Sequence, residues 1–215
     1  MSKTLAQIRA ITRRFIDETE DTSPTTWTNA ELNAYINDGQ MFLLSEMMRT
    51  NPDYSLSRAT SATVAAQAAY APPADLYGSK LRGMWVYNTS AGHRYEVQYK
   101  SNDTIMALQS QSGFPAYYSL INDGIVLAPV PDGAYTLEMW YTAKPADLAS
   151  DSETTWFKDE EVESVAAWAA VKALNRINRD SSGVAKILDA VLAQVKANIS
   201  QDDNLAIDCE PMDMS

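Results

Sequence analysis

Residues 114–145 have the sequence FPAYYSLINDGIVLAPVPDGAYTLEMWYTAKP, and they decide the fold class of this chain. Short apolar segments flank Asn122-Asp123-Gly124, where glycine takes the positive φ that a tight turn requires. A second turn is expected at Pro131-Asp132-Gly133, because proline presets φ and glycine closes the reversal. The predicted strands are residues 116–121, 125–128 and 134–142. We therefore predict a three-stranded antiparallel meander, in which the third strand alternates between two unlike faces.

The sequence before the meander predicts more β-structure. The Ala/Thr-rich residues 58–71 are expected to form one or two strands at a sheet edge. Residues 81–88 and 93–100 are predicted to pair as a hairpin around a turn at 89–92. One helical turn is expected over residues 103–108.

Two helices are predicted at the start of the chain. Thr4 and Gln7 have the spacing of a capping box, and a helical apolar stripe follows them to about residue 18. Thr28 and Glu31 have the same spacing at the start of the second helix. Between the two helices, residues 17–26 are polar and predict a loop.

The second predicted helix carries two further local features. Trp27 and Leu32 stand where a hydrophobic staple would fix the entry of the chain, and Pro52 ends the helix. Gly39 weakens the helix interior by up to ~1 kcal/mol relative to alanine, so we expect a close-packed neighbour at this position.

Two more helices are predicted after residue 158. Residues 159–161 are acidic and stand at a helix start, where the macrodipole favours negative charge. A short break at residues 180–183 makes the two helices antiparallel neighbours. The stripe expected to face the preceding helix consists of Ile187, Leu188, Val191, Leu192 and Val195.

This order of elements predicts an α+β protein. Neither helix pair buries its stripe alone, so we expect an antiparallel helical bundle with an inserted antiparallel β-rich domain. The expected segments are N-terminal helices over 1–52, the β-rich insertion over 53–150, a C-terminal helical hairpin over 151–200 and an acidic extended tail over 201–215.

Composition limits the functional classes to which this chain can belong. The formal charge of −11 disfavours a general phosphate-binding surface, and no apolar run approaches the length of a membrane span. The single cysteine, Cys209, has no internal disulfide partner. The sequence contains neither a phosphate loop nor a dinucleotide-binding motif, and its one histidine has no Cys/His partner for a metal site, so no cofactor is expected.

Several side chains have alternative interpretations. His93 is the base that a small hydrolase would need, or a solvated turn residue. The acids at 159–161 are metal ligands or a charged helix start, and the basic residues Arg9, Arg13 and Arg14 contact phosphates or form a solvated face. Met47 and Met48 pack in the core or serve an adaptable protein interface.

The tail after residue 200 has five acids, no base and too few apolar residues for a helical stripe. Its scattered apolar side chains are nevertheless more than a purely solvating tail needs. The predicted protein-interface residues are Leu205, Ile207, Met212, Met47 and Met48.

The order of several motifs resembles the head–tail connector (adaptor) proteins of tailed bacteriophages. In the helical part these motifs are Trp27-Thr28, Glu31-Leu32 and Tyr35-Ile36-Asn37-Asp38-Gly39-Gln40. In the β-rich part they are Tyr70 with Pro73, Asp75 and Leu76, then Pro115-Ala116-Tyr117-Tyr118, Asp123-Gly124-Ile125, Pro129-Val130-Pro131-Asp132, Tyr135-Thr136-Leu137, Tyr141 and Pro145.

The resemblance implies a non-enzymatic virion protein, made in the bacterial cytoplasm and placed at the capsid vertex. Such proteins form a homo-oligomeric ring, usually twelve-fold, between the portal protein and the tail or nozzle protein. DNA passes through the lumen without specific binding. Two alternatives are another tail or baseplate component with a protein- or glycan-binding β-domain and, more remotely, a small hydrolase using His93.

Overall fold

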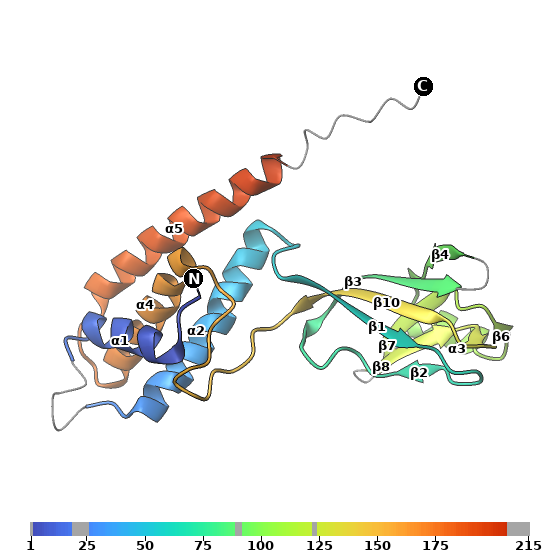
Figure 1. Ribbon diagram of the computed structural model, residues 1–215, viewed down its shortest axis with the longest axis horizontal. Helices are drawn as coiled ribbons and strands as arrows, with labels where there is room; N and C mark the ends of the chain where they lie inside the picture. Colours follow the sequence, from blue (N-terminus) through green and yellow to red (C-terminus); the bar gives the residue numbers. More distant parts are fainter. Residues whose placement is uncertain (1, 19–25, 89–91, 122–123, 206–215) are drawn as a thin grey trace. The chain divides into compact units, whose positions relative to one another are not determined.

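The computed structural model describes residues 2–18, 26–88, 92–121 and 124–205, with side chains for all of these except residues 80 and 201–205. These ranges contain both helices and largely antiparallel sheets, which confirms the predicted α+β class. The chain divides into two compact units (Figure 1). We call Met1–Tyr54 with Pro145–Ser215 the helical unit, and Ser55–Lys144 the β unit.

The helices of the helical unit are α1 Leu5–Phe15, α2 Asn29–Thr50, α4 Asp159–Arg176 and α5 Ser182–Leu205. Helix α4 contacts the other three. Both predicted capping boxes are present: Thr4 and Thr28 accept backbone N–H groups, and the Gln7 and Glu31 side chains bond back to the cap backbones. The hydrogen bond from the Thr28 backbone lowers the pKa of Glu31 below its usual value. These boxes fix where α1 and α2 begin.

Buried side chains at the start of α2 confirm the predicted hydrophobic staple. Trp27 and Leu32 are fully buried and belong to one cluster with Ile16 and Leu174. The staple therefore holds the entry to α2 against the end of α4 as well as against the end of α1.

Gly39 lies where α4 packs closely against α2, as a glycine in mid-helix predicts. A Cβ at Gly39 would lie 3.0 Å from the Val165 carbonyl oxygen and 3.1 Å from Cδ1 of Trp168. We expect Gly39→Ala to lower the free energy of unfolding by on the order of 1 kcal/mol, because overpacking outweighs the gain in helix propensity. Gly183→Ala on α5 is the matched control, since its added Cβ would meet no atom within 4 Å. Chemical denaturation should show opposite signs for the two substitutions; equal stabilisation would contradict close packing at Gly39.

Helix α5 packs on α4 through a narrower stripe than predicted. Leu188, Leu192, Val195 and Ile199 are buried, whereas Ile187 is 40% exposed, so its predicted burial is wrong. The buried residues follow a spacing of four, three and four, and Ile187 lies about 100° around the helix from Leu188.

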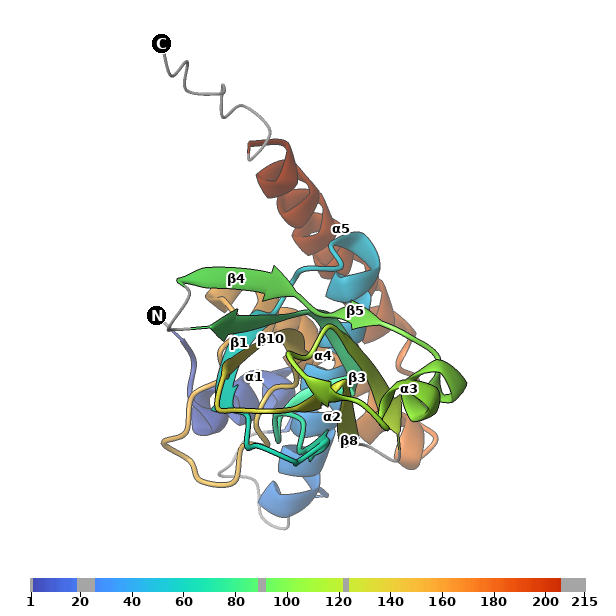
Figure 2. The ribbon, with the colours of Figure 1, turned by 90° about the vertical axis from the view of Figure 1, so that its right-hand side faces the viewer.

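The structure also corrects the expected end of the C-terminal helical hairpin. Helix α5 continues to Leu205, past the predicted boundary at residue 200, and its last turns extend beyond α4 (Figures 1 and 2). Adding a residue to an existing helix costs little, so the polar sequence there does not stop it.

The β unit contains two four-stranded sheets. One has the order β1-β10-β3-β4, formed by Leu56–Ala62, Thr136–Ala143, Leu76–Asn88 and His93–Glu96. The other has the order β2-β8-β7-β5, formed by Ala69–Tyr70, Gly124–Ala128, Tyr117–Ile121 and Gln98–Tyr99. The remaining elements are α3 Asn102–Leu108 and the short pair β6 Ser112–Gly113 and β9 Val130–Pro131. The core includes Met84, Val86, Ile125, Leu127, Leu137 and Met139.

The predicted meander is only partly correct. Strands β7 and β8 form the expected antiparallel pair, but β10 pairs with β1 and β3 in the other sheet. The reason is that β2 occupies the remaining edge of β8, through Ala69↔Val126 and Tyr70↔Ile125. The predicted alternation within β10 is confirmed, with Leu137, Met139 and Tyr141 buried.

Other β-predictions have mixed outcomes. The edge positions of β1 and β2 and the helical turn α3 are confirmed. The predicted strand 93–100 is divided, because β4 pairs with β3 whereas β5 pairs with β7 in parallel. Residues 122–123 of one predicted turn, 89–91 of another and 19–25 of the predicted loop lie outside the described residues.

Tyr141 makes the stability of the β unit pH-dependent. Burial raises the pKa of its phenol to about 12, and the hydrogen bond that Oη donates to Oδ1 of Asp75 (2.8 Å) acts in the same direction. The phenol has a pKa of ~10 in the unfolded chain, so the unfolded chain loses this proton at a lower pH than the folded chain does. Stability should therefore fall between about pH 10 and 12, and Tyr141→Phe should reduce that fall in denaturant midpoints. An unchanged slope in the variant would contradict this assignment.

Candidate functional site

The predicted interface residues have different positions in the structure. Met47 and Met48 are buried in the helical unit, which agrees with the core-packing interpretation. Leu205 is the last residue of α5, and Ile207 and Met212 lie outside the described residues. The two methionines therefore offer almost no surface to a partner of this folded chain.

The N-terminal arginines are structural, so the expected solvated face is wrong for two of them. Arg9 and Arg13 are buried, and only Arg14 is exposed. Arg9 donates to Oδ1 of Asn33 (3.1 Å) and to Oδ1 of Asp151 (3.0 Å). A guanidinium held in this way is not presented to a phosphate.

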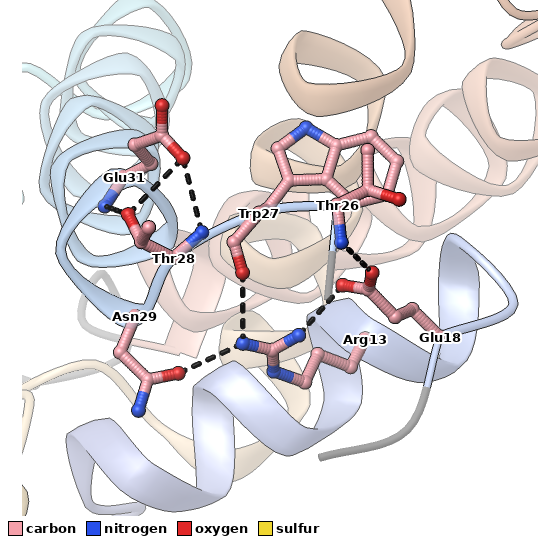
Figure 3. A network of polar contacts seen from close by, with 7 residues as sticks. All are labelled: Arg13, Glu18, Thr26, Trp27, Thr28, Asn29 and Glu31. Atoms are coloured by element: carbon pink, nitrogen blue, oxygen red, sulfur yellow. Dashed lines mark hydrogen bonds and ion pairs between the residues drawn. The ribbon is translucent and has the colours of Figure 1, made fainter. Parts of the chain in front are cut away.

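Arg13 forms a buried polar network that we call the Arg13 network (Figure 3). Its Nη1 lies 2.6 Å from Oε2 of Glu18, and both side chains are nearly inaccessible. Its Nη2 donates to the Trp27 carbonyl oxygen (3.2 Å) and to Oδ1 of Asn29 (2.8 Å). The other Glu18 oxygen accepts the Thr26 backbone N–H. The network thus ties α1 to the start of α2.

Two of the three carboxylates at the start of α4 have structural partners. Oε2 of buried Glu161 accepts the Lys158 backbone N–H at 2.8 Å, and Asp159 lies 3.9 Å from the Lys3 ammonium. Within the described ranges, no three His, Cys, Asp or Glu side chains are grouped as metal ligands. The charged-helix-start interpretation accounts for these acids.

His93 begins β4 and is exposed. Its described ring contact is an edge-on one with Tyr95, at a centroid distance of 6.1 Å. If the protein were a hydrolase with His93 as its base, His93→Ala would abolish the hydrolase activity. We instead expect the His93→Ala variant to fold and assemble normally. A melting curve and an infectivity assay measure the two outcomes. Loss of infectivity by a folded, incorporated variant would indicate a site at His93.

The outward face of the sheet β1-β10-β3-β4 carries a cluster around Glu138. Oε1 of Glu138 accepts Nη2 of Arg94 (2.9 Å) and Nε1 of Trp140 (2.8 Å), and lies 3.7 Å from Nη1 of Arg58. The Arg94 guanidinium lies 4.5 Å from the ring centroid of Trp85. Arginine and tryptophan are enriched where protein partners bind, so this face is a candidate interaction surface. Sequence alternation places these residues on one face, but only the sheet order brings them together.

The two units differ in charge. The β unit has six Lys/Arg residues and six Asp/Glu residues, whereas the helical unit has eleven Lys/Arg residues and twenty-two Asp/Glu residues. The whole net charge of −11 therefore belongs to the helical unit. Among the described residues, no helix is both long and apolar enough to cross a bilayer.

Comparison with known protein families decides the assignment. The family model described as SU10 adaptor protein matches residues 3–205. The chain belongs to the SU10 adaptor protein family. The match covers both units and confirms the resemblance to phage connector proteins that the sequence motifs indicated. A search of curated proteins found no match.

Membership in the SU10 adaptor family gives the functional class. The chain is a structural adaptor of a bacteriophage and a component of the virion, where it interacts with other virion proteins.

Proposed function

We propose that this protein is a head–tail adaptor that forms a ring between the portal and the tail and encloses part of the DNA channel. The observation that carries the proposal is the SU10 adaptor match over residues 3–205. We also propose that the four long helices form an antiparallel bundle from which the β-rich segment is an insertion.

Charge supports a passive role toward DNA. A twelve-fold ring would carry a formal charge of −132, twelve times −11. Duplex DNA carries one negative charge per ~1.7 Å of axis, so an acidic lumen repels it and favours passage over binding. Because the helical unit holds the whole net charge, we propose that this unit faces the channel.

The segment after α5 is proposed to dock on a neighbour, either the adjacent adaptor or the portal. Leu205, Ile207 and Met212 would supply the apolar contacts. Deletion of residues 206–215 removes this segment and leaves all of α5, so the truncated chain should melt like the full chain but fail to join portal-bearing heads. Undiminished incorporation would contradict docking through this segment.

Imaging of the particle vertex tests the ring itself. Electron cryomicroscopy of virions should place this chain as a closed ring between portal and tail, with the described residues fitted unit by unit. Density for the chain at a baseplate or on tail fibres, with none at the vertex, would overturn the proposal.

A second candidate function rests on exposed aromatic rings of the β unit. Tyr95 and Tyr99 are exposed, and a cavity of about 500 Å³ lies beside Pro72, Pro73 and Leu120. Such rings suit a tail or baseplate component that binds a protein or a glycan. Binding of the full chain to a glycan array, lost on Tyr99→Ala, would favour this function over the adaptor ring.

A further inference from the structure

Strand β1 has an open edge. It lies at the end of its sheet and pairs only with β10 among the described strands. At its two ends, the Ala143 N–H donates to the Ser55 carbonyl (3.1 Å) and the Thr63 N–H donates to the Tyr135 carbonyl (2.8 Å). In an antiparallel pair, every second residue of a strand makes the backbone hydrogen bonds to its neighbour. The N–H and C=O groups of the odd-numbered residues of β1 therefore point toward β10. The N–H and C=O groups of Leu56, Arg58, Thr60 and Ala62 therefore face away from the sheet.

Apart from one charged side chain, Arg58, this edge lacks the devices that usually block strand addition. The sequence of β1, LSRATSA, has no proline and no lysine, and its pairing with β10 shows no register shift. Its one charged residue, Arg58, lies on the outward face and not toward the core. The other described edges are shorter: β2 and β5 have two residues each, and β4 has four. An unprotected seven-residue edge is a template for another strand.

We propose that β1 binds residues 206–211 of a second copy of this chain, which add to the sheet as an extra strand. The inference rests on the proposed ring and names the surface on which the C-terminal segment docks. Strand addition of this kind uses backbone hydrogen bonds for affinity and alternate side chains for specificity.

The sequence of the segment suits this edge. Within it, Ile207 and Cys209 alternate with Ala206, Asp208 and Glu210, which is the period of a strand with two unlike faces. Pro211 then ends the pattern, since proline donates no hydrogen bond. Six residues in a strand span about 20 Å, close to the length of β1.

Charge complementarity favours the same partner. Arg58 is 58% exposed, and its contact with the half-buried Glu138 is long at 3.7 Å. Glu96 lies on the same outward face but on the opposite edge strand. Asp208 and Glu210 would fall on one face of the added strand, so one register brings a carboxylate to Arg58.

A second copy is favoured by the symmetry of a ring. Each subunit of a cyclic ring must present two different surfaces, one to each neighbour. The segment after α5 and the β1 edge are two such surfaces on one chain.

The test uses a fluorescent peptide of residues 204–215, with Cys209 replaced by serine, and the chain ending at Leu205. We expect binding in fluorescence anisotropy, with slower amide exchange at Leu56, Arg58, Thr60 and Ala62 in the complex. Thr60→Pro should weaken binding by at least about tenfold because it removes an outward N–H while leaving the bonds to β10. Thr60→Val is the matched control and should bind normally.

A charge exchange tests the same contact without relying on whether the Thr60→Pro variant folds. Arg58→Glu should weaken binding of the native peptide by about tenfold, and a peptide with Asp208→Lys and Glu210→Lys should restore it. No binding to the truncated chain, or binding with no added protection of β1, would overturn the proposal. Amide exchange of the full-length chain at low concentration gives a further check. If β1 is protected to the same degree at every protein concentration, each chain binds its own segment, and the proposal is overturned.

The outcome is separable from the ring proposal. A vertex ring seen in virions, together with no peptide binding, would reject the β1 site alone. Peptide binding by a chain absent from the vertex would reject the adaptor ring and leave the β1 site intact.

Discussion

Replacing Arg13 with alanine is expected to lower the free energy of unfolding by about 3–5 kcal/mol, because Glu18 is then left as a buried carboxylate without its cation. The pair is nearly inaccessible and its atoms lie 2.6 Å apart, so in the variant Glu18 stays buried but loses the guanidinium that neutralises its charge. The Trp27 carbonyl and the Asn29 side chain lose a donor in the same substitution. Urea denaturation followed by circular dichroism measures the loss.

Arg14→Ala provides the matched control for the Arg13 network. Arg14 is the next residue of α1 and is exposed, so its replacement should change stability by no more than about 0.5 kcal/mol. In the double variant Arg13→Ala/Glu18→Ala, the loss should be smaller than the sum of the single losses, because neither charge is left unpaired. Additive losses would show that the two residues do not act as a pair.

Leu192→Ala is expected to destabilise the helical unit by about 2–5 kcal/mol, the usual range for truncation of a buried leucine. Leu192 is buried in the middle of the stripe that faces α4, and Leu188→Ala one turn earlier should behave in the same way. Ile187→Ala is the control on the same helix, and its loss should be clearly smaller because that side chain is 40% exposed. Equal losses at Ile187 and Leu192 would contradict the packing of α5.

Features fixed by neighbours in sequence could be predicted from the residues alone. The capping boxes at Thr4 and Thr28 need a partner three positions away, and the β7–β8 pair needs only a short turn. Gly39 also indicated a close neighbour, because a glycine inside a helix has an energetic cost that packing must offset. The helical elements and this strand pair follow from such local physics.

Features fixed by distant residues could not be predicted in this way. The sheet that β10 joins depends on β2, which occupies the edge of β8. The burial of Arg9 depends on Asp151, which lies 142 positions later. The helical period of α5 identifies a stripe but not its width, which the surface of α4 decides. The predicted interface residues Ile207 and Met212 concern contacts with a second molecule, and the fold of one chain does not contain these.

The hydrogen bonds between the ends of the β unit have a consequence for how such chains diversify. Chain entry and exit lie side by side, since the Ser55 carbonyl accepts the Ala143 N–H and the Ser55 hydroxyl donates to the Ala143 carbonyl at 2.8 Å. A module whose ends meet can be exchanged as a cassette, because a replacement needs only to bring its own ends equally close. Exchange of the β unit between related chains therefore requires recombination at only two points, which lie next to each other in the fold.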